Sequence, residues 1–193
     1  MLSPLDPARS AIGFDSGEWT FSTAARYRSH MVSLPNYDTA RAFLDDLKAN
    51  GLSIATAESC TGGLIAASLA AVPGASAALE RGFVTYSNEA KTEMLGVPAA
   101  LIEAHGAVSR EVALAMAEGA LMHSRANIAV AVTGIAGPDG GSEGKPVGLV
   151  HIAAARLGGE TLHEEKRYGD LGRHEVQART VLDALALLRR LLD

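Results

Sequence analysis

The chain has 193 residues, enough for one well-packed domain and too few for two comfortable ones. Apolar residues make up 48% and charged residues 20%, which excludes a largely disordered chain, and aromatic residues reach only 5%, which predicts an aliphatic core. With a net charge of -5, the chain has no excess of basic residues. This argues against a main role on nucleic acid or on an anionic membrane surface.

The cysteine content and the hydropathy pattern indicate the cellular compartment of the protein. The single cysteine, Cys60, excludes an intrachain disulfide framework and a cysteine-rich zinc site, and it fits a reducing compartment. No apolar run approaches the roughly 18 residues of a membrane span, and the N-terminus lacks the apolar stretch of a secretory signal. We therefore predict a cytoplasmic protein.

Residues 1–36 differ in character from the rest of the chain. They contain prolines at positions 4, 7 and 35 and the only tryptophan, Trp19, and they show neither a helical nor a strand period. We interpret them as an N-terminal arm outside the functional domain, which is expected to occupy residues 37–193.

The regular pattern begins with a helix, a strand and a second helix. Asn36 or Asp38 is expected to cap the first helix, whose apolar side chains recur at helical spacing: Phe43, Leu44 and Leu47. Residues 52–57 have the composition of a buried strand, and after a break at 58–63 an alanine-rich helix is predicted over 64–72.

The same order is repeated further along the chain. A strand is predicted over residues 82–87, followed by a helix over 89–95 with Asn88 as its cap. Ser109 is expected to cap a long helix over residues 110–124, and the strongly apolar stretch 127–133 predicts another strand.

Residues 134–148 contain six glycines together with two prolines, so regular structure is excluded there and a functional loop is predicted. Two strands, over 147–156 and 160–168, flank a turn at Gly158-Gly159, and a last helix begins at Arg173.

This alternation predicts an α/β three-layer sandwich with a mixed, mainly parallel sheet and helices on both faces. In such folds, functional groups gather where strands end and loops begin. Three segments fall at such ends: 58–63, Ser87-Asn88 and 134–148.

Several well-known binding motifs are absent, because the chain lacks residues that they require. The glycine-rich loop has Asp139 and Pro146 where a phosphate-binding loop needs a glycine and a serine or threonine. No G-x-G-x-x-G follows a strand, and no two of the six histidines stand at i and i+4. We predict neither a metal site nor a bound cofactor.

Ser59 lies between a strand and a glycine-opened helix, which resembles the logic of a nucleophile elbow, although Ala57 and Thr61 replace its glycines. The backbone N–H groups there and the positive end of the helix suit an oxyanion or a phosphate. The alternative is that Ser59 and Thr61 only cap a helix from Gly62.

Lys91 falls in the first turn of its predicted helix, where the helix dipole disfavours a cation. With no histidine placed beside Ser59, a desolvated lysine is a candidate base, with Tyr86 as a possible proton relay between the two. The alternative for Lys91 is an ordinary solvated side chain. Cys60 is a less favoured nucleophile, because a lone cysteine in an apolar context is more often a small buried side chain.

Four motifs in the same order give the chain a family resemblance over residues 38–192. They are Glu58-Ser-Cys-Thr-Gly-Gly63, Gly82-Phe-Val-Thr-Tyr-Ser-Asn-Glu-Ala-Lys91, His105-Gly-Ala-Val-Ser109, and Thr133-Gly-Ile-Ala-Gly-Pro-Asp-Gly-Gly141 with Lys145-Pro-Val-Gly148. The chain closely resembles the nicotinamide-nucleotide amidase family, also called the CinA C-terminal-domain family. The resemblance implies hydrolysis of the carboxamide of nicotinamide mononucleotide in pyridine nucleotide recycling, and a homodimer or higher homo-oligomer.

The resemblance also implies roles for particular residues. The serine nucleophile of the family falls on Ser59, and its tyrosine and lysine partners fall on Tyr86 and Lys91. We expect the oxyanion donors among Thr61 to Gly63 or at Gly134, with Glu58 or Asp139 favouring a pyridinium charge. The full set of expected substrate-binding residues is Glu58, Thr61, Gly62, Gly63, Asn88, Ser109, Thr133, Gly134, Gly137 and Lys145.

Two departures from the family pattern precede and enter the last helix. The usual Gly-Asp-Arg run appears as Gly169-Asp-Leu-Gly-Arg173, with Leu171-Gly172 as an apparent insertion, and Gln177 stands where an arginine is common. We therefore do not expect a basic side chain from this region to contact the substrate. Two other functions share these residues: a non-catalytic nucleotide-binding module, which an exposed Lys91 remote from Ser59 would favour, and a serine–lysine amidase for another carboxamide.

Overall fold

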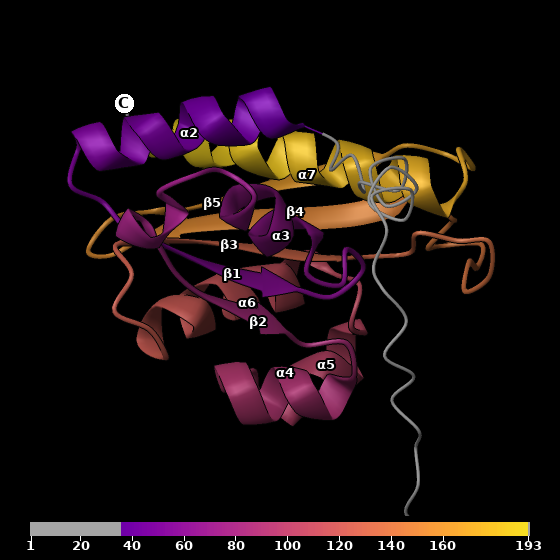
Figure 1. The fold of residues 1–193 in the computed structure, drawn as a ribbon. Coiled ribbons are helices and arrows are strands. Elements are labelled where there is room, and N and C mark those ends of the chain that lie inside the picture. Colours follow the sequence, from indigo (N-terminus) through magenta and orange to yellow (C-terminus); the bar gives the residue numbers. More distant parts are fainter. Residues whose placement is uncertain (1–35, 193) are drawn as a thin grey trace, which may run out of the picture. The chain divides into compact units, whose positions relative to one another are not determined.

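A five-stranded mixed sheet forms the centre of the computed structural model, which describes residues 36–192 (Figure 1). The strand order is β2-β1-β3-β4-β5, where β1 is Ile54–Glu58, β2 Leu79–Val84, β3 Ile128–Gly134, β4 Leu149–Arg156 and β5 Thr161–Arg167. β1 is parallel to β2 and β3, whereas β4 is antiparallel to both β3 and β5. Four of these five strands therefore run in one direction, as predicted.

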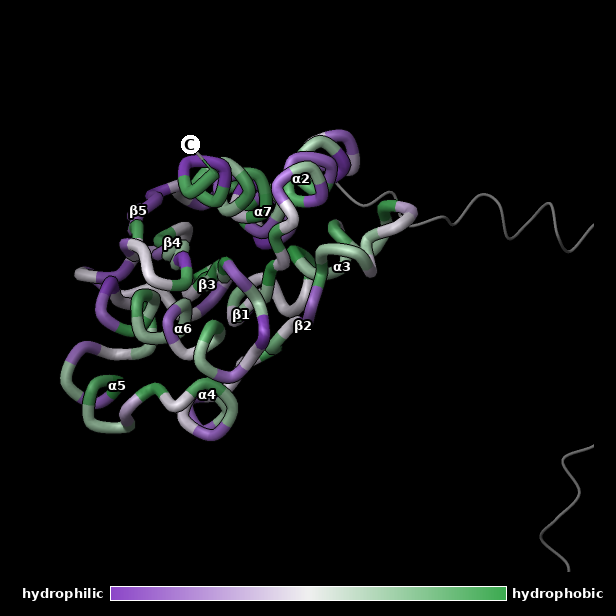
Figure 2. Tube along the Cα trace, turned by 90° about the vertical axis from the view of Figure 1, so that its left-hand side faces the viewer, coloured by the Kyte–Doolittle hydropathy of each residue, from purple (hydrophilic) through white to green (hydrophobic). Residues whose placement is uncertain are grey.

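Helices cover both faces of the sheet, which confirms the predicted three layers (Figure 2). One layer holds α2 (Tyr37–Ala49), α3 (Leu64–Ala70) and α7 (Arg173–Arg189), and a short 3-10 helix, η2 (Ala75–Ala77), follows α3. The opposite layer holds α4 (Asn88–Leu95), α5 (Ala99–His105) and α6 (Arg110–Met122). Within residues 36–192, no helix has the length and apolar character needed to cross a bilayer.

The two faces of the sheet carry side chains of different size. Because successive strand residues point to opposite faces, β1 sends Ile54 toward α3 and α7 and sends Ala55 and Ala57 toward α6. β3 and β4 follow the same rule, with valine and isoleucine on the first face and alanine on the second. Small side chains let α6 pack close to the sheet, so the alanine-rich composition has a structural reason.

The structure corrects several predicted boundaries and caps. β2 begins and ends three residues before the predicted strand, and α5 was not anticipated. Ser87, not Asn88, caps α4, because the Ser87 hydroxyl accepts the Ala90 N–H. Asn36 makes no capping bond and instead donates to the Ala178 carbonyl of α7, whereas Ser109 caps α6 as predicted.

The arm predicted over residues 1–36 lies outside the described residues, apart from Asn36. The domain is therefore described from its first helix onward. Helix α2 begins at Tyr37, and the domain boundary at this residue stays a prediction.

The contact between α6 and the end of α4 supplies a test of packing. A Cβ added at Gly119 would lie 2.1 Å from the Leu95 carbonyl oxygen, a backbone atom that cannot move aside cheaply. We expect Gly119→Ala to lower the free energy of unfolding by about 1–3 kcal/mol, measured by urea denaturation. Gly144→Ala, where an added Cβ meets nothing within 4 Å, is the matched control, and equal stabilities for the two variants would contradict this packing.

Candidate active site

Ser59 and Lys91 meet at the carboxyl end of the sheet. Ser59 directly follows β1, and Lys91 lies in the first turn of α4. The Lys91 Nζ atom lies 3.2 Å from Ser59 Oγ, and the Lys91 side chain is only 1% exposed. The solvated-lysine alternative is therefore wrong, and the predicted nucleophile and base lie within hydrogen-bonding distance of each other.

Two backbone carbonyls complete the surroundings of the Lys91 amine. The chain leaves β2 after Val84, and the carbonyl oxygens of Thr85 and Ser87 then lie 2.9 Å and 3.3 Å from Nζ. Burial lowers the pKa of Lys91, because it penalises the charged form. A neutral amine has two N–H donors and one lone pair, which match two carbonyls and the Ser59 hydroxyl.

Glu58 holds the start of α3 beneath this pair. Its buried carboxylate accepts hydrogen bonds from the N–H groups of Gly63, Ile65 and Ala66 at 2.8–3.1 Å. The hydroxyls of Thr56 and Thr61 donate to the same carboxylate. Glu58 therefore caps α3, and every one of these bonds is internal. Its role toward the substrate stays a prediction.

The same bonds decide between the two interpretations of Ser59. Neither Ser59 nor Thr61 accepts a helix N–H through its side chain, because Glu58 takes these donors. Thr61 is buried and donates its hydroxyl to Glu58, so its side chain is not available to a substrate. The capping alternative is wrong, and the Ser59 hydroxyl is left facing the Lys91 amine.

The loop after Ser59 turns on two glycines in the left-handed region, Gly62 with φ 62° and Gly63 with φ 101°. The Gly62 N–H donates to the Ser59 carbonyl and the Gly63 N–H to Glu58, so neither is available as the predicted oxyanion donor. Within residues 36–192, the N–H groups of Cys60 and Thr61 donate to no backbone carbonyl. These two are the candidate oxyanion donors.

A cavity of about 230 Å³ opens beside Ser59 and Lys91. The loops after β1, β2 and β3, the turn between α5 and α6, and the first residue of α7 form its walls. Its lining includes four residues that the sequence placed at the site besides Ser59 and Lys91: Tyr86, Asn88, Thr133 and Gly134. It also includes Arg173, which the sequence did not predict.

Arg173 joins two walls of this pocket. Its guanidinium donates to the Tyr86 hydroxyl at 2.7 Å and to the Gly137 carbonyl at 3.1 Å. Tyr86 is 60% exposed, and no hydrogen bond within residues 36–192 joins its hydroxyl to Ser59 or Lys91. The predicted tyrosine relay is therefore not formed, and this region does place a basic side chain in the pocket wall, which was not expected.

Other predicted substrate contacts support the pocket wall instead. The Ser109 hydroxyl accepts the Val112 N–H and donates to the Gly106 carbonyl, and Thr133 donates to the Ala107 carbonyl at 2.8 Å. Lys145 donates to the His105 carbonyl at the end of α5, where a cation complements the helix dipole. Ser109 and Lys145 are not among the residues that line the cavity, and their roles in substrate binding stay predictions.

Cys60 is a buried structural residue. Burial raises the pKa of its thiol to about 12, so the thiol stays protonated near neutral pH and is a poor nucleophile. Its carbonyl accepts a hydrogen bond from the Gln177 side chain at 2.9 Å. Within residues 36–192, no group of three His, Cys, Asp or Glu side chains is placed to hold a metal ion.

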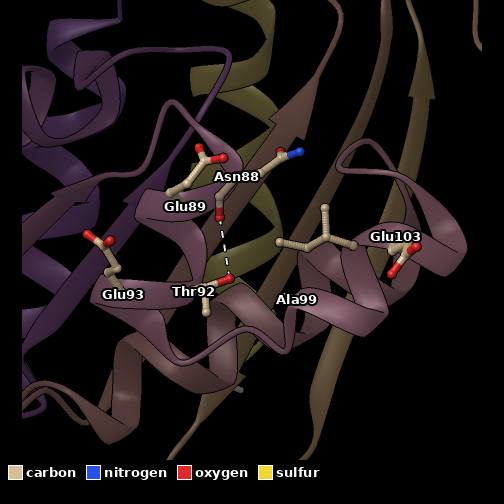
Figure 3. Close-up of a pocket in the computed structure, with 7 residues that line it drawn as sticks. Asn88, Glu89, Thr92, Glu93, Ala99 and Glu103 are labelled. Atoms are coloured by element: carbon tan, nitrogen blue, oxygen red, sulfur yellow. Dashed lines mark hydrogen bonds between the residues drawn. The ribbon is translucent and has the colours of Figure 1, made fainter.

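A second cavity, of about 380 Å³, lies between α4 and α5 and shares Asn88 with the first (Figure 3). Figure 3 shows the side chains of Glu89, Glu93 and Glu103 around it, and the Thr92 hydroxyl donates to the Asn88 carbonyl. Neither Ser59 nor Lys91 lines this cavity, so the chemistry of the pair belongs to the smaller pocket.

Comparisons with known proteins show which family the chain resembles. The model of the CinA C-terminal domain matches residues 36–192. A CinA-like protein from Citrifermentans bemidjiense is 53% identical over 146 residues, which cover 76% of this chain and 35% of that protein. The chain thus spans about a third of the length of the curated relatives it matches.

Solved structures show the same fold. The crystal structure of competence/damage inducible protein CihA from Agrobacterium tumefaciens has a TM-score of 0.80 and 55% sequence identity, and the match covers 81% of this chain and 95% of that one. A CinA superfamily protein from Klebsiella pneumoniae has a TM-score of 0.77 and 36% identity, with 81% and 97% covered.

The cap on α3 can be tested by replacing Glu58. Glu58→Gln puts an amide NH2 group against backbone N–H donors, so we expect the free energy of unfolding to fall by about 1–3 kcal/mol in urea denaturation. Glu143→Gln, on an exposed loop, is the matched control and should change stability by less than about 0.5 kcal/mol. A Glu58 variant as stable as the control would show that the carboxylate does not hold the helix.

Proposed function

The chain belongs to the CinA C-terminal domain family, and we propose that it is a serine amidase that hydrolyses the carboxamide of nicotinamide mononucleotide. The products are nicotinic acid mononucleotide and ammonia. The observation that carries the proposal is the buried Lys91 amine 3.2 Å from Ser59 Oγ. The choice of substrate is supported by the resemblance of the four sequence motifs to the nicotinamide-nucleotide amidases.

In the proposed mechanism the neutral Lys91 amine takes the Ser59 hydroxyl proton as Oγ attacks the carboxamide carbon. The resulting ammonium returns a proton to the leaving nitrogen, and ammonia departs. Lys91 then deprotonates a water molecule that attacks the ester carbon. The resulting ammonium returns the proton to Ser59 Oγ as the nicotinic acid mononucleotide departs. The direct contact of amine and hydroxyl makes a tyrosine relay unnecessary.

The tetrahedral intermediate needs hydrogen-bond donors for its oxyanion. The Cys60 and Thr61 N–H groups follow the nucleophile and donate to no backbone carbonyl within residues 36–192. In nucleophile elbows, the N–H after the serine has this role. Each such donor contributes about 3 kcal/mol to transition-state stabilisation.

The remaining parts of the substrate can be matched to the other lining residues. Arg173 presents a guanidinium at the pocket, and guanidinium groups bind phosphate through paired hydrogen bonds. The exposed Tyr86 ring offers an aromatic face to the pyridinium cation. A non-catalytic binding module is disfavoured, because it does not require a lysine buried against a serine hydroxyl.

The proposal is tested by ammonia release from nicotinamide mononucleotide with purified protein. We expect Ser59→Ala and Lys91→Met each to lower kcat/KM at least about 1,000-fold, because each removes an essential part of one catalytic unit. Ser76→Ala, an exposed serine in η2, is the matched control and should retain full activity. Unchanged release by Ser59→Ala would end the nucleophile assignment.

One further variant and a panel of substrates extend this experiment. Tyr86→Phe should keep kcat within about tenfold of the unmodified protein, since a relay would cost the 100-fold or more typical of lost acid–base catalysis. A panel of other carboxamides separates the proposed substrate from a serine–lysine amidase of different specificity. Faster hydrolysis of another amide, with the same dependence on Ser59 and Lys91, would replace the substrate and keep the mechanism.

The pH dependence follows from the lowered pKa of Lys91. Activity requires the neutral amine, so kcat/KM should fall as pH decreases through a pKa below the ordinary lysine value of about 10.4. The charge of Glu89 raises the pKa of Lys91, so Glu89→Gln should move this acid limb to lower pH. An acid limb at the ordinary lysine value, or one that Glu89→Gln moves upward, would contradict the assignment of Lys91 as base.

A further inference from the structure

The side chain of Gln177 contacts the loop that follows β1, although the two are far apart in the sequence. We propose that Gln177 is a positioning residue that fixes the direction of the Thr61 N–H as an oxyanion donor. The proposal rests on the serine chemistry described above. At this position the chain has a neutral amide side chain.

The contact itself is direct. Gln177 lies one helical turn after Arg173 on α7, and its side-chain nitrogen donates to the Cys60 carbonyl at 2.9 Å. This bond joins positions 117 residues apart in the chain and is partly buried. Within residues 36–192, no other donor contacts the Cys60 carbonyl.

The peptide plane transmits this restraint to Thr61. The Cys60–Thr61 peptide bond is trans, so its carbonyl and its N–H point in opposite directions. Holding the Cys60 carbonyl with Gln177 therefore sets the direction of the Thr61 N–H. The preceding peptide is held in the same way, because the Ser59 carbonyl accepts the Gly62 N–H and so orients the Cys60 N–H.

The loop needs such a restraint at this point. Gly62 and Gly63 follow immediately, and glycine has the widest conformational freedom of any residue. Glu58 holds the chain from Gly63 onward and holds the Thr61 side chain, but it makes no bond to the Cys60–Thr61 peptide group itself. Gln177 supplies the anchor on that group.

The experiment compares Gln177→Met, which removes the donor at nearly constant length, with Gln177→Arg, which restores one. For hydrolysis of nicotinamide mononucleotide, we expect Gln177→Met to lower kcat at least about tenfold and to leave KM within twofold, because the donor acts in the transition state. Gln177→Arg should recover kcat to within about threefold. Arg179→Ala, an exposed neighbour on α7 paired with Glu175, is the matched control and should be unchanged.

A second substrate separates this proposal from the choice of nucleotide. When p-nitrophenyl acetate acylates Ser59, Oγ forms the acetyl ester, p-nitrophenolate leaves and Lys91 takes the hydroxyl proton. The rate of this burst, with mass analysis locating the acetyl group, should fall at least about tenfold in Gln177→Met. If nicotinamide mononucleotide is not hydrolysed but this difference is found, the nucleotide assignment fails and the role of Gln177 stands.

The proposal is overturned by any of three results. One is equal acylation rates in Gln177→Met and the unmodified protein. Another is a loss that Gln177→Arg does not recover, or that appears as a raised KM with unchanged kcat, since either would indicate loss of structure or of binding. The third is failure of the unmodified protein to acylate at Ser59.

Discussion

The buried carboxylate of Glu58 is the interaction on which the rest of the site depends. It ends β1 and accepts three backbone N–H groups at the start of α3, where the helix dipole favours a negative charge. Because this carboxylate caps α3, the serine next to it is released from a capping role. The Ser59 hydroxyl can then face the Lys91 amine.

The second constraint is the burial of that amine among neutral partners. Two carbonyls and one hydroxyl lie within 3.3 Å of Nζ. Desolvation favours the uncharged form of the amine. Burying this lysine lowers the stability of the fold, but it allows the amine to act as a base. The early end of β2 matters here, because it turns the carbonyls of Thr85 and Ser87 toward the amine.

All three layers of the fold contribute to the pocket. The sheet supplies Ser59, the α4–α6 layer supplies Lys91, and α7 in the opposite layer supplies Arg173. Arg173 bonds to the walls formed after β2 and β3, and Gln177 bonds to the loop after β1. One helix thus contacts the ends of three strands, which explains how a site made of loops can keep a fixed shape.

The sequence alone determined the α/β class, the strand end that carries Ser59 and the anomalous placement of Lys91, because these follow from local periodicity and from charge at a helix start. Tertiary structure decided which polar groups are already bonded within the protein. Glu58 caps α3, Ser109 caps α6, Lys145 donates to the His105 carbonyl, and the Tyr86 hydroxyl accepts from Arg173. Tertiary structure also brought Gln177 to Cys60, a contact between residues 117 positions apart. Spacing along the chain shows which side chains can reach a strand end, but only packing shows which of them still has a free donor or acceptor there.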